Sequence, residues 1–350
     1  MRVLGYWIKR IVGVAVVLLL LLLAPVLWVE AMCRGEGPPE AYAAILPPEH
    51  RRDEVKTLMT YPEWHIVHAY DDYARVIAEG DPHEYGYLRA IRGFWSSLCA
   101  LSERSAALSG ESGGIRQTVH VIGVSFTAEL LLKAAYEETV GRLFAWLRGA
   151  ERAPLDDLSA AQAAGYARFL QQTPWYRWDF DGDVAALEAA RTDTLRDRER
   201  RLALGLEYGA KSAYAGVIAS AVESVGHDET TLRMIVRGIP AETLRAMEGA
   251  SVAVERDEGI EIETPRYRAL THLLAAMAQA GADFVEIAGN DDILLTALSG
   301  DAGTEDAIFT FPRQGYGDYR HLILVKVTDL ADRLRAMAEG PVTLEHVHDY

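Results

Sequence analysis

The sequence predicts an α+β protein built from an N-terminal transmembrane helix, an all-α helical domain and a C-terminal ferredoxin-like α+β domain. Three observations lead to this fold class. Residues 11–29 form an uncharged apolar run, residues 57 to about 224 have a helical pattern, and short β-like runs alternate with helices after residue 226. The predicted boundaries are 1–32 for the membrane anchor, 33–56 for a linker or ordered arm, 57–225 for the helical domain and 226–350 for the α+β domain.

Composition narrows the class of protein. The chain has 350 residues, half of them hydrophobic, and only two cysteines. Two cysteines exclude a disulfide-rich scaffold and a four-cysteine zinc site. The 35 Lys and Arg residues stand against 51 Asp and Glu residues, a formal charge of −16. Nucleic-acid binding needs a basic face, so we expect no nucleic-acid partner.

The first 32 residues are predicted to anchor the protein in a membrane. As a helix, the 19 residues from 11 to 29 would rise about 28 Å, close to the ~30 Å thickness of the hydrocarbon layer. Trp7 and Trp28 flank the run, and Arg2, Lys9 and Arg10 precede it. The positive-inside rule then places the N-terminus in the cytoplasm. We therefore expect a bacterial-type inner-membrane protein with its globular part in the periplasm.

A cleaved signal peptide is the alternative interpretation of this segment, and it predicts export as well. Without residues 1–32 the chain loses three basic residues and one acidic residue, which leaves a formal charge of −18. Anionic lipid headgroups would repel such a surface. Contact with the membrane is therefore expected through residues 11–29.

Within the helical domain, the sequence predicts helices from Pro82 to about 108, over about 115–147, from Pro154 onward, and over about 183–204 and 206–223. Cys33 and Cys99 are the only thiols. An oxidising compartment would permit a disulfide between them, and a simple buried thiol at position 99 is the alternative.

The C-terminal domain is predicted from strands at 232–237, 251–255, 282–287, 292–298, 307–311, 322–327 and 342–347, with helices at 241–248, 266–280 and 329–338. Leu-Arg-Ala-Met occurs at 244 and again at 334, and Val-Ala-Val-Glu at 252 resembles Val-Thr-Leu-Glu at 342. This offset of 90 suggests a duplicated βαβ unit, and two such units would form a ferredoxin-like sandwich.

The chain lacks the common catalytic signatures, including GxGxxG after a strand, Walker A, GxSxG, HExxH and CxxC. Histidine and carboxylate groups gather instead in the segment 60–74. Helical spacing puts His65, His68 and Asp72 on one face, beside an apolar stripe. Two imidazoles and a carboxylate are ligands for a divalent metal such as zinc, or a general acid/base pair. A solvated polar face is the alternative.

Two other places carry histidine. His120 lies in a helix that is apolar nearly all round, where a buried histidine needs a partner. If it faces the helix at 60–74, it would complete a catalytic site with His65 or His68 and a carboxylate. At the C-terminus, His346 and His348 would share one face of a strand. Metal chelation and solvent exposure are both open there.

These observations suggest two functions. The first is a single-pass, exported envelope protein of unknown specific activity that binds a protein partner or an apolar ligand. The second is an anchored enzyme, metal-assisted or of the His/carboxylate acid-base type, with His65, His68, Asp72 and His120 as candidate catalytic residues and His65, His68 and Asp72 as candidate metal ligands. The cofactor is unknown, with a divalent metal such as zinc as the candidate.

Overall fold

The computed structural model describes residues 2–36, 42–110, 113–225, 230–304 and 306–350. The chain is a mixture of helices and two antiparallel sheets, as the α+β class predicts. The predicted domain boundary at 226 lies outside the described residues. The helices are α1 (Arg2–Met32), α2 (Lys56–Met59), α3 (Tyr61–Glu79), α4 (Tyr87–Arg104), α5 (Gly113–Tyr136), α6 (Arg142–Arg148), α7 (Pro154–Leu170), α8 (Phe180–Ala190), α9 (Leu195–Val225), α10 (Ala241–Ala246), α11 (Tyr267–Gln279) and α12 (Val327–Glu339).

Among the described residues, two helical stretches are long and apolar enough to cross a membrane. The first, Val12–Met32, lies in α1 and covers the predicted apolar run 11–29 except for its first residue. The second, Gly113–Arg148, joins α5 to α6 through a π-helical turn (Glu137–Gly141). Sequence analysis predicted a helix here but not membrane contact.

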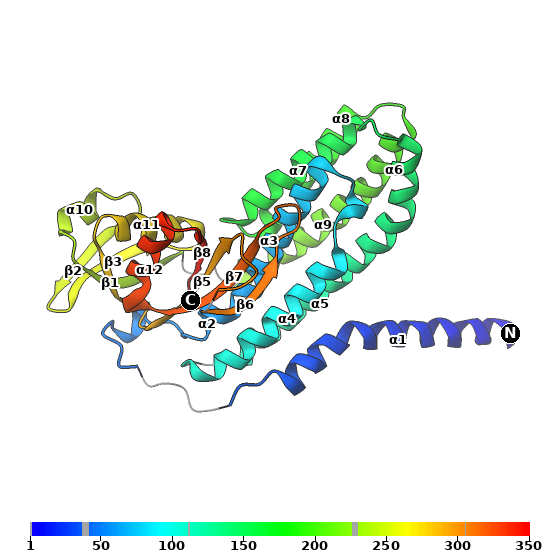
Figure 1. Cartoon of the computed structure of the whole chain (residues 1–350). Coiled ribbons are helices and arrows are strands. Elements are labelled where there is room, and N and C mark those ends of the chain that lie inside the picture. Colours follow the sequence, from blue (N-terminus) through cyan, green and yellow to red (C-terminus); the bar gives the residue numbers. More distant parts are fainter. Residues whose placement is uncertain (1, 37–41, 111–112, 226–229, 305) are drawn as a thin grey trace.

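Helices α3 to α9 form an elongated bundle, and α1 meets the bundle at its C-terminal end and extends away from it (Figure 1). The predicted break near residue 205 is wrong, because α9 is continuous from Leu195 to Val225. The interruption between helices lies earlier, between α8 and α9. There Asp197 accepts hydrogen bonds from the Thr192 backbone N–H and hydroxyl at 2.7 and 2.5 Å. These bonds hold the turn between α8 and α9, and Gly205 is tolerated inside the helix.

The strands form two four-stranded antiparallel sheets. The first sheet has the order β2-β3-β1-β4 and the second the order β6-β7-β5-β8. The segments matched at the offset of 90 are not equivalent in these sheets, because β2 pairs with β3 whereas β8 pairs with β5. The strands are β1 (Thr231–Arg237), β2 (Ser251–Arg256), β3 (Gly259–Pro265), β4 (Asp283–Ile287), β5 (Asp292–Ser299), β6 (Ala307–Pro312), β7 (Tyr319–Lys326) and β8 (Thr343–His348).

The second sheet lies between the first sheet and the helical bundle (Figure 1). Ile293, Leu295 and Val347 from this sheet belong to the core shared with the first sheet, α11 and α12. Leu294 and Leu322 belong instead to the core of α3, α4 and α5. Alternating side chains along its strands thus fill two different cores. The face toward the bundle positions the candidate site.

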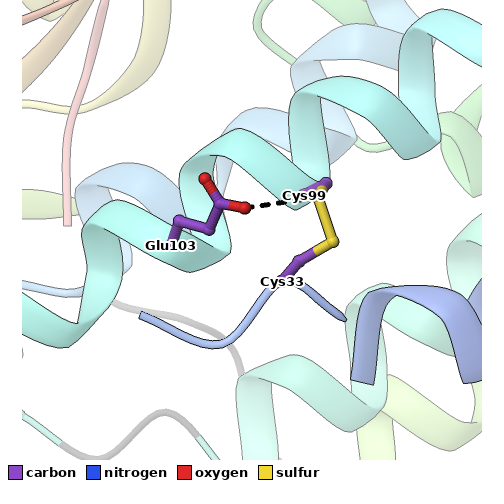
Figure 2. Close-up of side chains that lie close together, drawn as sticks. All are labelled: Cys33, Cys99 and Glu103. Atoms are coloured by element: carbon purple, nitrogen blue, oxygen red, sulfur yellow. Dashed lines mark hydrogen bonds between the residues drawn. A yellow bond between two sulfur atoms is a disulfide. The ribbon is translucent and has the colours of Figure 1, made fainter. Parts of the chain in front are cut away.

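The segment 42–55 is an ordered arm along the α+β part, one of the two possibilities predicted for residues 33–56. The Glu286 carboxylate accepts hydrogen bonds from the Ile45 and Leu46 backbone N–H groups at 2.6 and 2.8 Å. Cys33 and Cys99 form a disulfide, so the free-thiol alternative is wrong (Figure 2). The disulfide joins the residue after α1 to the C-terminal half of α4.

Candidate functional site

The predicted polar face of α3 is buried rather than solvated. His65, His68 and Asp72 are 4, 6 and 5% exposed, and they point away from water toward α4 and the second sheet. The alternative of a solvated face is therefore wrong for these three residues. It holds for the neighbouring Arg75, which forms an exposed i, i+4 ion pair with Glu79.

The second sheet covers this face of α3 with polar side chains of its own. Four of these side chains are buried or nearly buried, and all come from β7 and β8. Together with the three residues of α3 they are named the buried polar cluster, which comprises His65, His68, Asp72, Arg320, Glu345, His346 and His348. Trp64 links the two elements, because its ring lies 3.6 Å from that of His346 between centroids. The C-terminal histidines thus meet the α3 histidines, which the sequence did not predict.

Arg320 and Glu345 form the central ion pair of the buried polar cluster. The Arg320 Nε and Nη2 groups donate to the two carboxylate oxygens of Glu345 at 2.5 and 2.6 Å. Arg320 is fully buried, and its pKa is raised further by Glu345 and Asp72 although burial opposes this. The bidentate geometry compensates for the loss of hydration of both charges. His68 Nε2 lies 3.7 Å from the same carboxylate, beyond hydrogen-bond distance.

Burial holds the histidines of the cluster in the neutral form. It lowers the pKa of His65 and of His348 to about 3, and it lowers those of His68 and His346 well below the usual value. The positive charge of Arg320 adds to this effect at His65, His68 and His348. Neutral imidazoles keep a nitrogen lone pair available as a ligand or base.

The tautomer of His65 follows from its neighbour. His65 Nε2 lies 3.1 Å from the Ala90 carbonyl oxygen, so Nε2 carries the proton. His346 Nδ1 is hydrogen-bonded to the Thr271 hydroxyl at 2.9 Å, and the same hydroxyl oxygen accepts the Val347 N–H. Among the described atoms, His65 Nδ1, His68 Nε2 and both ring nitrogens of His348 have no hydrogen-bond partner.

Asp72 lies at the other end of the cluster. One of its oxygens accepts the Gln314 backbone N–H at 2.9 Å, and the other lies 4.0 Å from Arg313 Nε. Burial raises the pKa of this carboxyl to about 7, although Arg320, the hydrogen bond from Gln314 and Arg313 lower it. A carboxyl that titrates near neutrality is able to exchange a proton at physiological pH.

A cavity of about 40 Å³ adjoins these groups. It is lined by His65, Asp72 and Arg320, with Gly93 and Phe311 among its apolar walls. This volume has room for about one to three water molecules. It is far below the roughly 300 Å³ typical of a site for a small-molecule ligand. The cavity therefore suits buried water better than an organic substrate.

The three candidate metal ligands face different groups in this arrangement: His65 the Ala90 carbonyl, His68 the Glu345 carboxylate at 3.7 Å, and Asp72 the Gln314 N–H. In the described part of the chain, the residues that bring three ligand atoms within 4.8 Å of one another form two other groups. Zinc or another divalent metal at His65, His68 and Asp72 stays a prediction.

Neither of these two groups is a plausible metal site. In one, the sulfurs of Cys33 and Cys99 are joined in the disulfide beside Glu103 (Figure 2). The other consists of Glu54, Asp291 and Asp292. The Lys326 ammonium forms ion pairs with Asp291 and Asp292 at 3.0 and 2.6 Å.

His120 is not part of the buried polar cluster. Its Nε2 lies 3.4 Å from a carboxylate oxygen of Glu30, at the end of α1. Arg116 donates to the same oxygen at 2.9 Å, and the ring of Trp95 is stacked parallel to that of His120 at 6.4 Å. The predicted meeting of His120 with His65 or His68 is therefore not observed. The helix face of His120 points toward α1 and α4 instead of α3.

Arg320 and Glu345 are the two cluster residues that sequence analysis did not single out. Arg320 stands between Tyr319 and His321 at the start of a strand, where a single arginine is typical of an exposed edge.

No protein-family model, curated protein or solved structure matches the chain.

Proposed function

We propose that the protein is a single-pass, exported envelope component, anchored through α1 in a bacterial-type inner membrane, whose α+β part binds a protein partner. The disulfide carries the location in this proposal. Cys33 follows α1 directly and is paired with Cys99. Disulfides persist in oxidising compartments, so the chain after α1 belongs on the periplasmic side. Arg2, Lys9 and Arg10 on the other side of the apolar run favour the same orientation.

We also propose that the α+β part consists of two ferredoxin-like units in tandem. Residues 231–287 have the element order β-α-β-β-α-β, and residues 292–348 have the same order without the first helix. Both sheets have the strand order 2-3-1-4. Helix α11 begins at Tyr267 and α12 at Val327, which supports a repeat of 60 residues in place of the 90 suggested by short matches. Such units serve many unrelated functions, among them protein binding.

The buried polar cluster favours a binding protein over the alternative, an anchored metal or acid-base enzyme. Its side chains are enclosed between α3 and the second sheet, and the adjoining cavity has room for water only. His120, the fourth candidate catalytic residue, lies elsewhere. We infer that the cluster fixes the docking of the helical bundle on the sheet.

Thiol trapping tests the location. The full chain is expressed in a bacterium, quenched with acid and treated with a maleimide polymer, with and without prior reduction. We expect no adduct on the wild type before reduction and two after it. Cys99→Ser is the control, with one adduct in both conditions. Two adducts without reduction would place the thiols in the cytoplasm and overturn the proposal.

Metal analysis tests the alternative function. The full chain is purified in detergent without chelator, beside the His65→Ala/His68→Ala variant and the exposed control His272→Ala. We expect substoichiometric metal in all three proteins. Near-stoichiometric zinc that is lost only in the double variant would overturn the binding proposal in favour of a metal enzyme.

A further inference from the structure

The exposed large apolar side chains of the described residues are concentrated on one part of the bundle. Outside α1 there are fifteen, of which seven lie in 121–147 and five in α9, against three elsewhere. Leu132, Leu206 and Val217 are 74, 68 and 65% exposed. A soluble helical bundle carries charged side chains on its outer face. The helical stretch Gly113–Arg148 and helix α9 do not follow that rule.

The charged residues of this part are turned inward instead. Glu129 and Lys133 of α5 meet Glu207 and Lys211 of α9, with Lys211–Glu129 at 2.8 Å and Lys133–Glu207 at 3.1 Å. Their side chains are 31, 14, 20 and 16% exposed, in the order named. Ionisable side chains that pair inside while apolar ones face outward are typical of helices in contact with lipid. The i, i+4 pair of Lys211 with Glu207, at 3.0 Å, belongs to the same quartet.

The apolar faces of the two helices lie on the same side. The pairing of residue 133 with 207 and of 129 with 211 shows that α5 and α9 are antiparallel. At about 100° per residue, Leu132 is turned about 60° from Glu129, and Leu206 about 100° from Glu207 in the same sense. In an antiparallel pair, residues that are turned in the same sense from the facing residues, each about its own helix axis, lie on the same side of the pair. Tyr70 of α3, which donates to Glu129 at 2.6 Å, lies among the elements on the other side.

The uncharged outer face has the length of a hydrocarbon layer. Between Arg116 and Glu138 the only charged residues other than the inward pair are at the π-helical end, where Glu137 is buried. Between Arg201 and Glu223 the only ones are the inward pair of α9. Each interval is about 20 residues or roughly 30 Å. The ion pairs set Arg116 level with the end of α9 near Glu223.

This face adjoins the proposed anchor at one end. Glu30, at the end of the apolar run of α1, pairs with Arg116 at 2.9 Å. From this contact α1 and the bundle extend in different directions (Figure 1). The face is therefore a second apolar surface beside the end of α1.

We propose that the outer face of α5 and α9, named the lipid face (Val121, Leu131, Leu132, Leu206, Tyr214 and Val217), contacts the acyl chains of the bilayer beside α1. This goes beyond the expectation that the membrane is contacted through residues 11–29 alone. The formal charge of −18 argues against contact with anionic headgroups, and it does not bear on an uncharged face that reaches the acyl chains. A second copy packed on this face is the competing occupant, and the experiment separates the two.

The experiment measures the lipid accessibility of single spin labels on the full chain in vesicles of neutral phospholipid, with the native disulfide intact. Leu132→Cys and Val217→Cys place the label on the lipid face, and Leu206→Cys is the reserve site. Asp157→Cys on α7 is the water-exposed control, and Val17→Cys on α1 is the membrane control. All replaced side chains are exposed, so the substitutions remove no packing.

We expect labels at Leu132 and Val217 to collide with oxygen several-fold more often than with a water-soluble nickel complex, as at Val17, and the label at Asp157 to show the reverse. Water-like values at Leu132 and Val217 with a lipid-like Val17 would overturn the lipid face and leave the anchor standing. Water-like values at Val17 would instead contradict the proposed function. Low access to both reagents that rises on dilution with unlabelled chain would also overturn the proposal and favour a second copy.

Discussion

Asp72→Asn offers a direct test of how the buried polar cluster affects stability. The asparagine keeps an oxygen that accepts the Gln314 N–H, but it has no ionised form. The pKa of Asp72 is about 7 in the folded chain and near the ordinary 3.8 after unfolding. Between these values the folded state holds one proton more than the unfolded state. The stability contributed by Asp72 therefore falls as pH rises from about 4 to 7.

The magnitude follows from the size of the shift. Three pKa units at about 1.4 kcal/mol each correspond to about 4 kcal/mol. The free energy of unfolding of Asp72→Asn should therefore equal that of the wild type near pH 4. It should exceed the wild-type value by about 4 kcal/mol at pH 8 and above. The neutral histidines of the cluster contribute to both proteins and cancel in this difference.

Urea unfolding of the full chain in micelles, followed by tryptophan fluorescence, measures the difference at several pH values. Trp64 stacks on His346 and reports the separation of α3 from the second sheet. Asp71→Asn is the matched control, since this adjacent carboxylate is 29% exposed and receives the Tyr316 hydroxyl. A difference that does not grow with pH, or that grows equally for Asp71→Asn, would refute the assignment of the effect to burial of Asp72.

Three further substitutions test other contacts by the same unfolding assay. Arg320→Met should lower the free energy of unfolding by about 3–5 kcal/mol, because it leaves the Glu345 carboxylate uncompensated. A double variant that also replaces Glu345 by Met should recover much of this loss. An unaltered unfolding midpoint in the single variant would contradict a strong ion pair. Cys99→Ser should lower the free energy of unfolding by up to about 4 kcal/mol, because the disulfide encloses 66 residues. Reductant should destabilise the wild type but not this variant. A variant that still responds to reductant would contradict this cause. Gly123→Ala should lower the free energy of unfolding by about 1–3 kcal/mol, although alanine has the better helix propensity. The cause is the new Cβ, which would lie 2.4 Å from a ring carbon of Phe94. A stabilised variant would show that the Phe94 ring moves aside without cost.

The sequence predicted the face of α3 but not what covers it. Helical spacing correctly put His65, His68 and Asp72 together, because that depends on local geometry alone. Period two likewise put His346 and His348 on one face, but their exposure depends on which layer packs there. That layer is α3, and the residues in contact, Trp64 with His346 and His348, are more than 280 positions apart in the chain. A partner so distant leaves no periodic signal.

The inward charges of α5 and α9 illustrate the same limit. The spacing of Glu129 and Lys133 is typical of an i, i+4 ion pair, but Lys133 pairs across the bundle with Glu207. The two possibilities give the same local pattern. Only the relative rotation of two helices distinguishes them, and tertiary packing determines that rotation.

The second sheet contributes to two cores, which limits how this protein can be divided or recombined. A chain that ends near residue 225 would expose the apolar and histidine-bearing side of α3 to water. One that begins there would leave Leu294 and Leu322 without cover. Each fragment would expose an apolar surface that is buried in the full chain, so we expect expression of either fragment to give aggregates. In evolution, too, exchange of the bundle would require a matching change in the sheet face, so the two halves are expected to be inherited together.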